Sequence, residues 1–354
     1  MNINPFKKFK KIFQNFFKEF AQFLFFLIYG RITDVINPLS SEDISIKNIN
    51  NECNYKIYFV KNGRLYTDRI NDTAVILKNK VINGPSYQLR SRPNDPLSAR
   101  NNASIENNVV FKKGTPRFKK KIKGKVLSLL SGGGANKNYF HWLFDVLPRI
   151  SILENFDKKI VPDYLLTPCH DLQFQKESLS FLGFNDKKLL SSVKYRHIEC
   201  DDLIVTDHPY NITGDSDVDH ETIPIWISSW LKKKFLKFKK LGNYNPRIYI
   251  DRKSTEDTNF KRAIYNEDEL KTFLKEHNFE IVKLEEKTFD EQISIFNSAE
   301  LIIGLHGAGF ANISFCKKNT KVIELRSKTT LKVIENIALK NELNYQAFEC
   351  DSIN

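Results

Sequence analysis

The stretch GLHGAGFAN, residues 304–312, places three glycines and a histidine directly after the apolar run Leu301 to Ile303. Glycine has no side chain, so its backbone can approach a ligand closely, and a following helix begins with unpaired N–H groups that carry partial positive charge. The pattern predicts an anion site in which His306 and the amides of Gly307, Ala308 and Gly309 donate to phosphate oxygens. Asn312, which closes the stretch, is a further candidate.

Two other interpretations of this stretch are a tight turn between a strand and a helix, capped by the histidine, and the oxyanion hole of an esterase. The esterase interpretation requires a GxSxG nucleophile elbow, and this pattern does not occur in the sequence. Acyl hydrolysis is therefore disfavoured, and the choice lies between an anion site and a structural turn.

Three charged residues of the same half could complete a nucleotide site. Glu324 ends the apolar segment KVIEL, where a carboxylate can accept hydrogen bonds from the two hydroxyls of a ribose. Arg252 follows the segment RIYID and could offset the charge of a diphosphate. Arg262, in the next loop, is a further candidate, for which a surface role is the alternative. The chain has neither a P-loop nor a GxGxxG fingerprint.

An acid-base pair is predicted in NYFHWLFDVLPR, residues 138–149. His141 and Asp145 are four residues apart, so they share one face of a helix, and the residues between them are apolar. A carboxylate beside an imidazole can act as a general base toward a sugar hydroxyl, so we expect Asp145 to be the base, with His141 orienting it or replacing it. A purely structural pair near Pro148 is the alternative, but the preceding SGGGANKN also predicts a turn that a ligand can approach.

A third motif, DSDVD at residues 215–219, contains the DxD pattern that holds a divalent metal in one class of glycosyltransferases. Asp215 and Asp217 fall in the segment 208–246, which resembles a linker because it contains three prolines and a lysine run. Acidic turns are common, so the metal site is the less favoured interpretation.

The elements that must position these residues follow from the apolar pattern. From residue 247 onward, five predicted strands alternate with predicted helices, which implies a parallel sheet with right-handed crossovers. Residues 125–206 repeat this alternation less regularly, so we expect a second α/β unit. Residues 40–110 contain short strand-like pieces, and we expect them to form an amino-terminal elaboration of this unit.

The first 30 residues predict an amphipathic helix. Phenylalanines and leucines from Phe6 to Leu27 recur at helical spacing, while the lysines lie largely on the other face. The longest uninterrupted apolar run is too short to cross a bilayer, so we expect the helix to lie on an anionic membrane surface. A helix packed on its own protein is the alternative.

Composition narrows the class of protein. The 354 residues carry a net charge of +13, and 41% are hydrophobic, as in a globular protein of about two domains. Nucleic acid is excluded as an expected partner because the basic runs lack the aromatic or zinc-binding patterns of such proteins. Five scattered cysteines without a CxxC pair favour a reducing cytoplasm and argue against structural zinc.

The order of NYFHWLFDVLPRI, YIDRK, NEDEL, LEEKTFDEQISIFNSAELIIGLHGAGFANISF and VIEL resembles glycosyltransferase family 61 over roughly residues 125–345. This resemblance implies a GT-B fold: two Rossmann-like α/β domains whose parallel sheets face a central cleft. It also implies inverting transfer from a nucleotide sugar without an obligatory metal. Residues 306–309 match the donor-side motif of the family, and Asn138, His141 and Asp145 match the motif that faces the acceptor.

From these observations we expect three parts: an amphipathic membrane-associating helix over residues 1–36, an acceptor-side α/β domain over 37–225, and a nucleotide-sugar-binding domain over 226–354. The expected protein is cytoplasmic, is bound to the inner face of the membrane, and takes a UDP-linked donor and a glycan or lipid-linked glycan acceptor. We expect no cofactor and no metal. A metal-dependent transferase that uses Asp215 and Asp217, and a non-catalytic scaffold that binds nucleotide sugar or glycan, remain alternatives.

Overall fold

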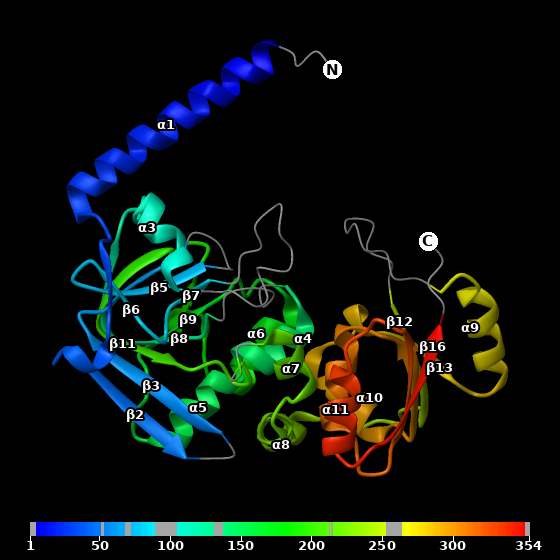
Figure 1. Ribbon diagram of the computed structural model, residues 1–354. Coiled ribbons are helices and arrows are strands. Elements are labelled where there is room, and N and C mark those ends of the chain that lie inside the picture. Colours follow the sequence, from blue (N-terminus) through cyan, green and yellow to red (C-terminus); the bar gives the residue numbers. More distant parts are fainter. Residues whose placement is uncertain are drawn as a thin grey trace.

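The computed structural model describes residues 5–50, 53–67, 72–88, 105–130, 137–211, 213, 215–252 and 264–350. Over these residues the chain forms an 11-stranded sheet, built from its first 206 residues, and a 5-stranded sheet, built from residue 247 onward. The two sheets and their helices lie beside each other (Figure 1). The fold is α/β, as the sequence predicts.

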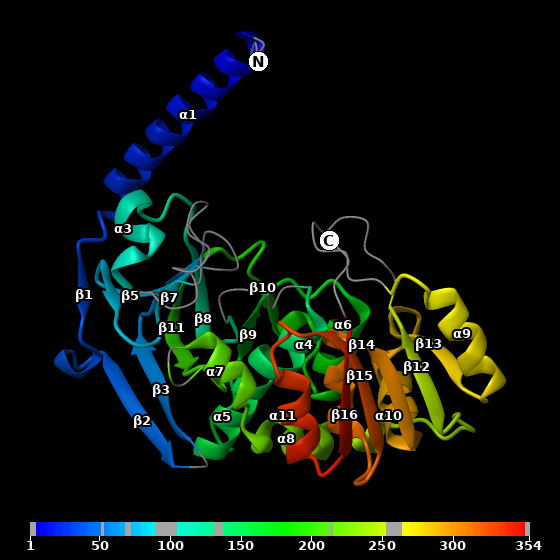
Figure 2. The same cartoon turned by 45° about the vertical axis from the view of Figure 1, so that its right-hand side comes forward.

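The second sheet is entirely parallel, which confirms the predicted architecture of this half. Its strands are β12 (Arg247–Asp251), β13 (Glu280–Lys283), β14 (Leu301–Leu305), β15 (Lys321–Ser327) and β16 (Asn344–Cys350), in the spatial order β13-β12-β14-β15-β16. The connecting helices are α9 (Glu267–Glu276), α10 (Phe289–Ser298) and α11 (Val333–Lys340), and the segment after β14 is a 3-10 helix, η8 (Ala308–Phe315). Figure 2 shows α9 on the outer side of this sheet.

The strand order reverses direction between β12 and β14. The chain passes from β12 outward to β13, returns across β12 to β14, and then continues in the opposite direction to β15 and β16. In open parallel sheets, ligands bind outside the carboxyl ends of the strands at such a switch point. The segments that follow β12 and β14 therefore occupy the position where this fold class binds ligands.

The first sheet is mixed, so the expectation of two purely parallel sheets is wrong for this half. Four neighbouring strands are parallel: β11 (His197–Thr206), β8 (Lys120–Ser128), β9 (Tyr164–Thr167) and β10 (Leu189–Ser191). Strands from residues 34–88 extend the sheet: β1 (Asp34–Ile36), β2 (Ile44–Asn50), β3 (Asn54–Lys61), β4 (Arg64–Tyr66), β5 (Asp72–Leu77), β6 (Lys80–Ile82) and β7 (Tyr87–Gln88).

Short turns explain why most of these added strands are antiparallel. Lys78 and Asn79, between β5 and β6, both have positive φ, as the two central residues of a type I′ hairpin turn do. A parallel pair needs a long crossover connection, which these closely spaced segments cannot supply. Strands β3 and β4 also pair with β11 in antiparallel orientation, although β11 lies far along the sequence.

The helix expected to carry His141 and Asp145 is divided into three pieces. These are α4 (Tyr139–His141), a π-helical turn over Trp142–Val146, and α5 (Pro148–Phe156). Pro148 has no N–H to donate to the preceding turn, and the N–H of Leu147 instead bonds to the carbonyl of Trp142, at 3.1 Å. Single π-helical turns of this kind occur frequently at functional sites.

Of the remaining helices, α3 (Val109–Lys113) and α6 (Gln173–Phe181) lie between strands of the first sheet, and α7 (Ser216–Glu221) and α8 (Ile225–Phe235) lie between the two sheets in the chain. Short 3-10 turns lie at Pro38–Ser40, Ile105–Asn107, Asp186–Lys188, Leu236–Phe238 and Leu284–Glu286. Leu143, Ile227 and Phe310 belong to one buried cluster, although they come from the two halves and the segment between them. The apolar core is therefore continuous across both sheets.

Helix α1 (Pro5–Tyr29) projects from the body of the protein (Figure 1). Its last turns contact the first sheet, where the ring of Phe25 lies 5.1 Å from that of Phe118 and the ring of Tyr29 lies 5.1 Å from that of His197. The helix is shorter than the predicted 1–36 segment, since residues 34–36 belong to β1. Among the described residues, no helix is long and apolar enough to cross a membrane.

Candidate functional site

The switch point of the second sheet brings Arg252 and His306 together. Arg252 follows β12 directly, His306 follows β14, and Nη1 of Arg252 donates to the carbonyl oxygen of His306 at 3.0 Å. Gly307 lies beside this contact, where a Cβ atom would come within 3.2 Å of the same Nη1. The glycine therefore makes room for the guanidinium group at the carboxyl edge of the sheet.

The carboxylate of Glu324 contacts the imidazole of His306 from the interior of the protein. Its side chain is fully buried, Oε1 lies 2.5 Å from Nδ1 of His306, and Oε2 accepts a hydrogen bond from the hydroxyl of Tyr345 at 2.5 Å. Arg326 lies 3.9 Å from Oε2. Because both carboxylate oxygens already have partners inside the protein, this geometry favours a role in orienting His306 over the ribose contact expected from the sequence.

Two of the three glycines in GLHGAGFAN lie in tightly packed positions. A Cβ at Gly304 would lie 3.0 Å from Cβ of Ile250, and one at Gly309 would lie 2.7 Å from Cδ1 of Leu284. Ala308 packs against the main core cluster. The first N–H groups of η8 have no acceptor within the helix, so the amides at its start remain suited to an anion.

Asn312 is fully buried and joins the two halves of the protein. Its Oδ1 accepts a hydrogen bond from the hydroxyl of Tyr139 at 2.6 Å, and its Nδ2 donates to Gln292 Oε1 at 3.0 Å. Tyr139 begins α4, the helix that carries His141, whereas Asn312 lies in η8. The contact therefore links the element bearing the predicted acid-base pair to the element that follows His306.

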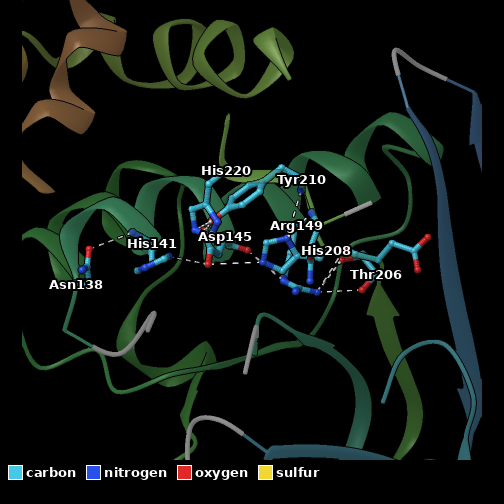
Figure 3. A network of polar contacts seen from close by, with 10 residues as sticks. Asn138, His141, Asp145, Arg149, Thr206, His208, Tyr210 and His220 are labelled. Atoms are coloured by element: carbon cyan, nitrogen blue, oxygen red, sulfur yellow. Dashed lines mark hydrogen bonds and ion pairs between the residues drawn. The ribbon is translucent and has the colours of Figure 1, made fainter. Parts of the chain in front are cut away.

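His141 and Asp145 form the predicted pair (Figure 3). Nδ1 of His141 lies 2.9 Å from Oδ2 of Asp145. The side chain of His141 is 24% exposed and that of Asp145 is 8% exposed, so the imidazole is the more accessible member. Asn138 is the N-cap of α4, because its Oδ1 accepts from the backbone N–H of Phe140 at 2.9 Å and of His141 at 3.3 Å. It fixes the start of the helix that carries His141.

The structure adds two residues that the sequence analysis did not identify. The hydroxyl of Tyr210 donates to Oδ1 of Asp145 at 2.7 Å, and Nε2 of His208 lies 3.6 Å from Oδ2. Both residues follow β11, at the carboxyl end of a parallel strand, and that position is the signal that could have found them.

A third residue missed from the sequence is Arg149, whose side chain is fully buried. It donates to the carbonyl oxygens of Asp145, at 3.1 Å, and of Thr206, at 2.9 Å. Arg149 thereby connects the π-helical turn to the end of β11, so the acid-base pair and the residues after β11 are held in one network (Figure 3).

The electrostatics of this network keep the Asp145 carboxylate charged. Burial tends to raise the pKa of Asp145, but the neighbouring His141 and hydrogen bonds from His141 and His208 hold it well below its usual range. Burial acts to lower the pKa of His141, and the charge of Asp145 outweighs it, so the net pKa of His141 is raised above 6.5. Burial lowers the pKa of His208, which favours its neutral form.

The DxD motif occupies the start of α7. Oδ1 of Asp215 accepts from the backbone N–H groups of Asp217 at 2.9 Å and Val218 at 3.3 Å, so Asp215 is an N-cap. Within the described residues, no cluster of three or more His, Cys, Asp or Glu side chains is placed to hold a metal ion. Arg262 lies outside the described residues.

Comparison with known families identifies the chain. Residues 139–323, just over half of its 354 residues, match the family described as Glycosyltransferase 61. The match includes the network around Asp145 and the Arg252–His306 contact, and it ends one residue before Glu324. No curated protein matches the chain significantly. The protein therefore belongs to glycosyltransferase family 61 and is a glycosyltransferase, an enzyme that acts on a sugar donor and a glycan acceptor.

Proposed function

We propose that this protein is an inverting, metal-independent glycosyltransferase that moves a sugar from a UDP-linked donor to a lipid-linked surface glycan, with its two halves arranged as a GT-B fold. The observation that carries the proposal is the His141–Asp145 pair on one half, together with the Arg252–His306 contact at the switch point of the other. The Tyr139–Asn312 hydrogen bond ties the two elements together.

His141 is the proposed general base. It is more exposed than Asp145, and the low pKa of Asp145 makes that carboxylate a weak base. Asp145 instead accepts the hydrogen bond of Nδ1, which leaves Nε2 of His141 as the nitrogen that takes a proton. The sequence motif suggested Asp145 as the base, with His141 either orienting it or replacing it. The geometry favours replacement: His141 is the base, and Asp145 orients it.

The donor diphosphate is assigned to the carboxyl edge of the second sheet. Arg252 supplies a permanent positive charge there, and the side chain of His306, 15% exposed, is oriented by buried Glu324. The N–H groups at the start of η8 add donors. Together these groups would stabilise the negative charge that develops on the leaving diphosphate.

The reaction follows from these positions. His141 removes the proton from an acceptor hydroxyl, and the oxygen forms a bond to the anomeric carbon as the bond from that carbon to the diphosphate oxygen breaks. The electron pair leaves with the diphosphate, which Arg252 and His306 stabilise. One displacement from the opposite face inverts the anomeric configuration and requires no covalent intermediate.

Association with a membrane is proposed through α1. Its apolar face is exposed over most of its length, and the basic side chains of the helix lie mainly on the other face. At its end, Phe25 and Tyr29 pack on the body of the protein, so the helix is anchored with its outer phenylalanines unburied. An amphipathic helix with these features binds in the plane of an anionic bilayer at its cytoplasmic side. The exposed apolar side chains are Phe9, Ile12, Phe13, Phe16, Phe17, Phe20, Phe23, Leu24, Leu27 and Ile28.

The proposal is tested by sugar transfer from a panel of UDP-sugars to a membrane lipid extract, with wild type, His141→Ala and His277→Ala. We expect His141→Ala to lose transfer at least about 100-fold, as for removal of a general base. His277, exposed at the end of α9, is the control and should be neutral. Full transfer by His141→Ala would remove the base from the mechanism.

The same assay distinguishes the two alternatives. A metal-dependent transferase would lose activity in EDTA and regain it with manganese, whereas the proposed enzyme keeps its activity in EDTA. A non-catalytic scaffold would bind UDP-sugars but would give no product with any donor in wild type.

A further inference from the structure

Tyr210 holds the oxygen of Asp145 that His141 does not contact. Its hydroxyl donates to Oδ1 at 2.7 Å, while Oδ2 lies 2.9 Å from Nδ1 of His141. Tyr210 is buried, with 3% of the residue exposed. Each carboxylate oxygen therefore has a donor from a different segment, Tyr210 at one and His141 at the other. Together the two contacts fix the position and the orientation of the carboxylate (Figure 3).

Tyr210 is itself fixed by its neighbours. Its ring packs edge-on against His208, with centroids 4.7 Å apart, and against His220, with centroids 5.3 Å apart. Nδ1 of His208 accepts the backbone N–H groups of Tyr210, at 3.3 Å, and Asn211, at 3.0 Å. A neutral His208 must then carry its proton on Nε2, the nitrogen that faces Asp145. The loop after β11 thus presents two donors to one carboxylate.

We propose that Tyr210 is a positioning residue for the transfer reaction: by donating to Oδ1 it fixes Asp145 against His141 and limits how strongly that carboxylate retains the proton of the imidazole. This inference rests on the proposed role of His141 as the base. It extends the site to the loop after β11, which the motif around residues 138–149 does not include. A carboxylate that shares its charge with a second donor is a weaker partner for the imidazolium, so the base releases its proton more readily.

The titratable and charged groups around the contact between Asp145 and Tyr210 come from three segments. They are His141 and Arg149 on the helical segment, His208 and Tyr210 after β11, and His220 on α7, whose Nε2 lies 3.4 Å from the Tyr210 hydroxyl; buried Asp219 also acts on Tyr210. Tyr210→Phe removes one hydroxyl from this set and keeps the ring that packs against His208 and His220. The charges around Asp145 are then unchanged.

The experiment compares Tyr210→Phe with Tyr55→Phe. The hydroxyl of Tyr55 donates to the carbonyl of Pro209 at 2.7 Å, so this control also removes a buried hydroxyl that holds the same loop, without a contact to Asp145. The pKa of His141 is measured by NMR titration of histidine-labelled protein, with its signal assigned from His141→Ala. The pH dependence of transfer is measured with the best UDP-sugar of the panel.

We expect Tyr210→Phe to raise the pKa of His141 by about half a unit to one unit, since a charged hydrogen bond on its partner carboxylate is lost. The acid limb of the rate profile should move upward by the same amount, which lowers transfer near pH 6 by about three- to tenfold and spares it at alkaline pH. Tyr55→Phe should leave both midpoints in place even if it lowers stability.

An unchanged or lowered pKa of His141 in Tyr210→Phe would overturn the inference, as would an equal shift in both variants. Failure of the proposed function has a different signature: His141→Ala would retain full transfer. If His141→Ala is inactive while the midpoints of Tyr210→Phe match wild type, the base assignment stands and the role of Tyr210 falls.

Discussion

Replacing Asp145 with asparagine removes the charge at the centre of the network and keeps the size of the side chain. Three donors face the carboxylate: Nδ1 of His141 at 2.9 Å, the hydroxyl of Tyr210 at 2.7 Å and Nε2 of His208 at 3.6 Å. In the variant, the amide has one acceptor oxygen, and its NH₂ group faces another donor, with which it cannot form a hydrogen bond. Because breaking a buried ion pair costs about 3–5 kcal/mol, we expect the free energy of unfolding to fall by that amount.

The loss of stability in Asp145→Asn should be larger at acidic pH than at alkaline pH. The pKa of Asp145 is lowered, so its contribution is present at neutral pH and disappears only as strongly acidic pH protonates it. The pKa of His141 is raised, so the contribution of its charge is full below pH 6.5 and is lost as the pH rises through the folded value. The substitution should therefore cost more at pH 6 than at pH 9, by about 1.4 kcal/mol for each unit by which the pKa of His141 is raised.

The assay is urea unfolding of wild type and Asp145→Asn at pH 6 and pH 9, followed by tryptophan fluorescence, to which buried Trp142 contributes. Asp157→Asn, at the end of α5, is the control, because its side chain is outside the network. If the free energy of unfolding falls equally at both pH values, or does not change, the ion pair between His141 and Asp145 does not stabilise the protein as described.

Three further outcomes follow from the structure. Arg252→Ala should weaken UDP binding by at least about tenfold in a thermal-shift titration, as expected for loss of a charged hydrogen-bond partner, whereas Arg247→Ala, at the opposite end of β12, should not; equal affinities would exclude Arg252 from the donor site. Asn312→Ala should lower the free energy of unfolding by about 1–3 kcal/mol, because it leaves the half-buried Tyr139 hydroxyl without its acceptor, and a neutral result in urea unfolding would argue against the link between the halves. Replacing Phe13 and Phe16 with glutamate should abolish co-sedimentation with phosphatidylglycerol vesicles and leave the unfolding transition in place; retained sedimentation would show that α1 does not bind the bilayer.

Much of the second half of the chain could be predicted from its sequence, because regular alternation of strands and helices determines a parallel sheet with few alternatives. The ends of β12 and β14 then placed Arg252 near His306. The same logic failed for Glu324, because β15 continues to Ser327 and Glu324 lies in the middle of the strand rather than at its carboxyl end. In the structure, this carboxylate points into the protein, where it contacts His306 and accepts a hydrogen bond from Tyr345.

The first half was less predictable for physical reasons. Some of its antiparallel pairs are set by tight turns, as β5 and β6 are by Lys78–Asn79, whereas β3 and β4 pair with β11, which is distant in the sequence. The His141–Asp145 pair was visible because both residues lie within one helical turn. Tyr210 and His208 reach the same carboxylate from more than 60 positions away, and no local spacing connects them.

We propose that the two sites have separate roles: the second sheet binds the nucleotide, and the network around Asp145 activates the acceptor. Calorimetric titration of UDP into wild type and Asp145→Asn tests it most directly. The claim predicts that both proteins bind UDP with dissociation constants within about twofold, although the variant transfers no sugar. Absence of binding heat in wild type, or loss of UDP affinity in Asp145→Asn, would contradict it.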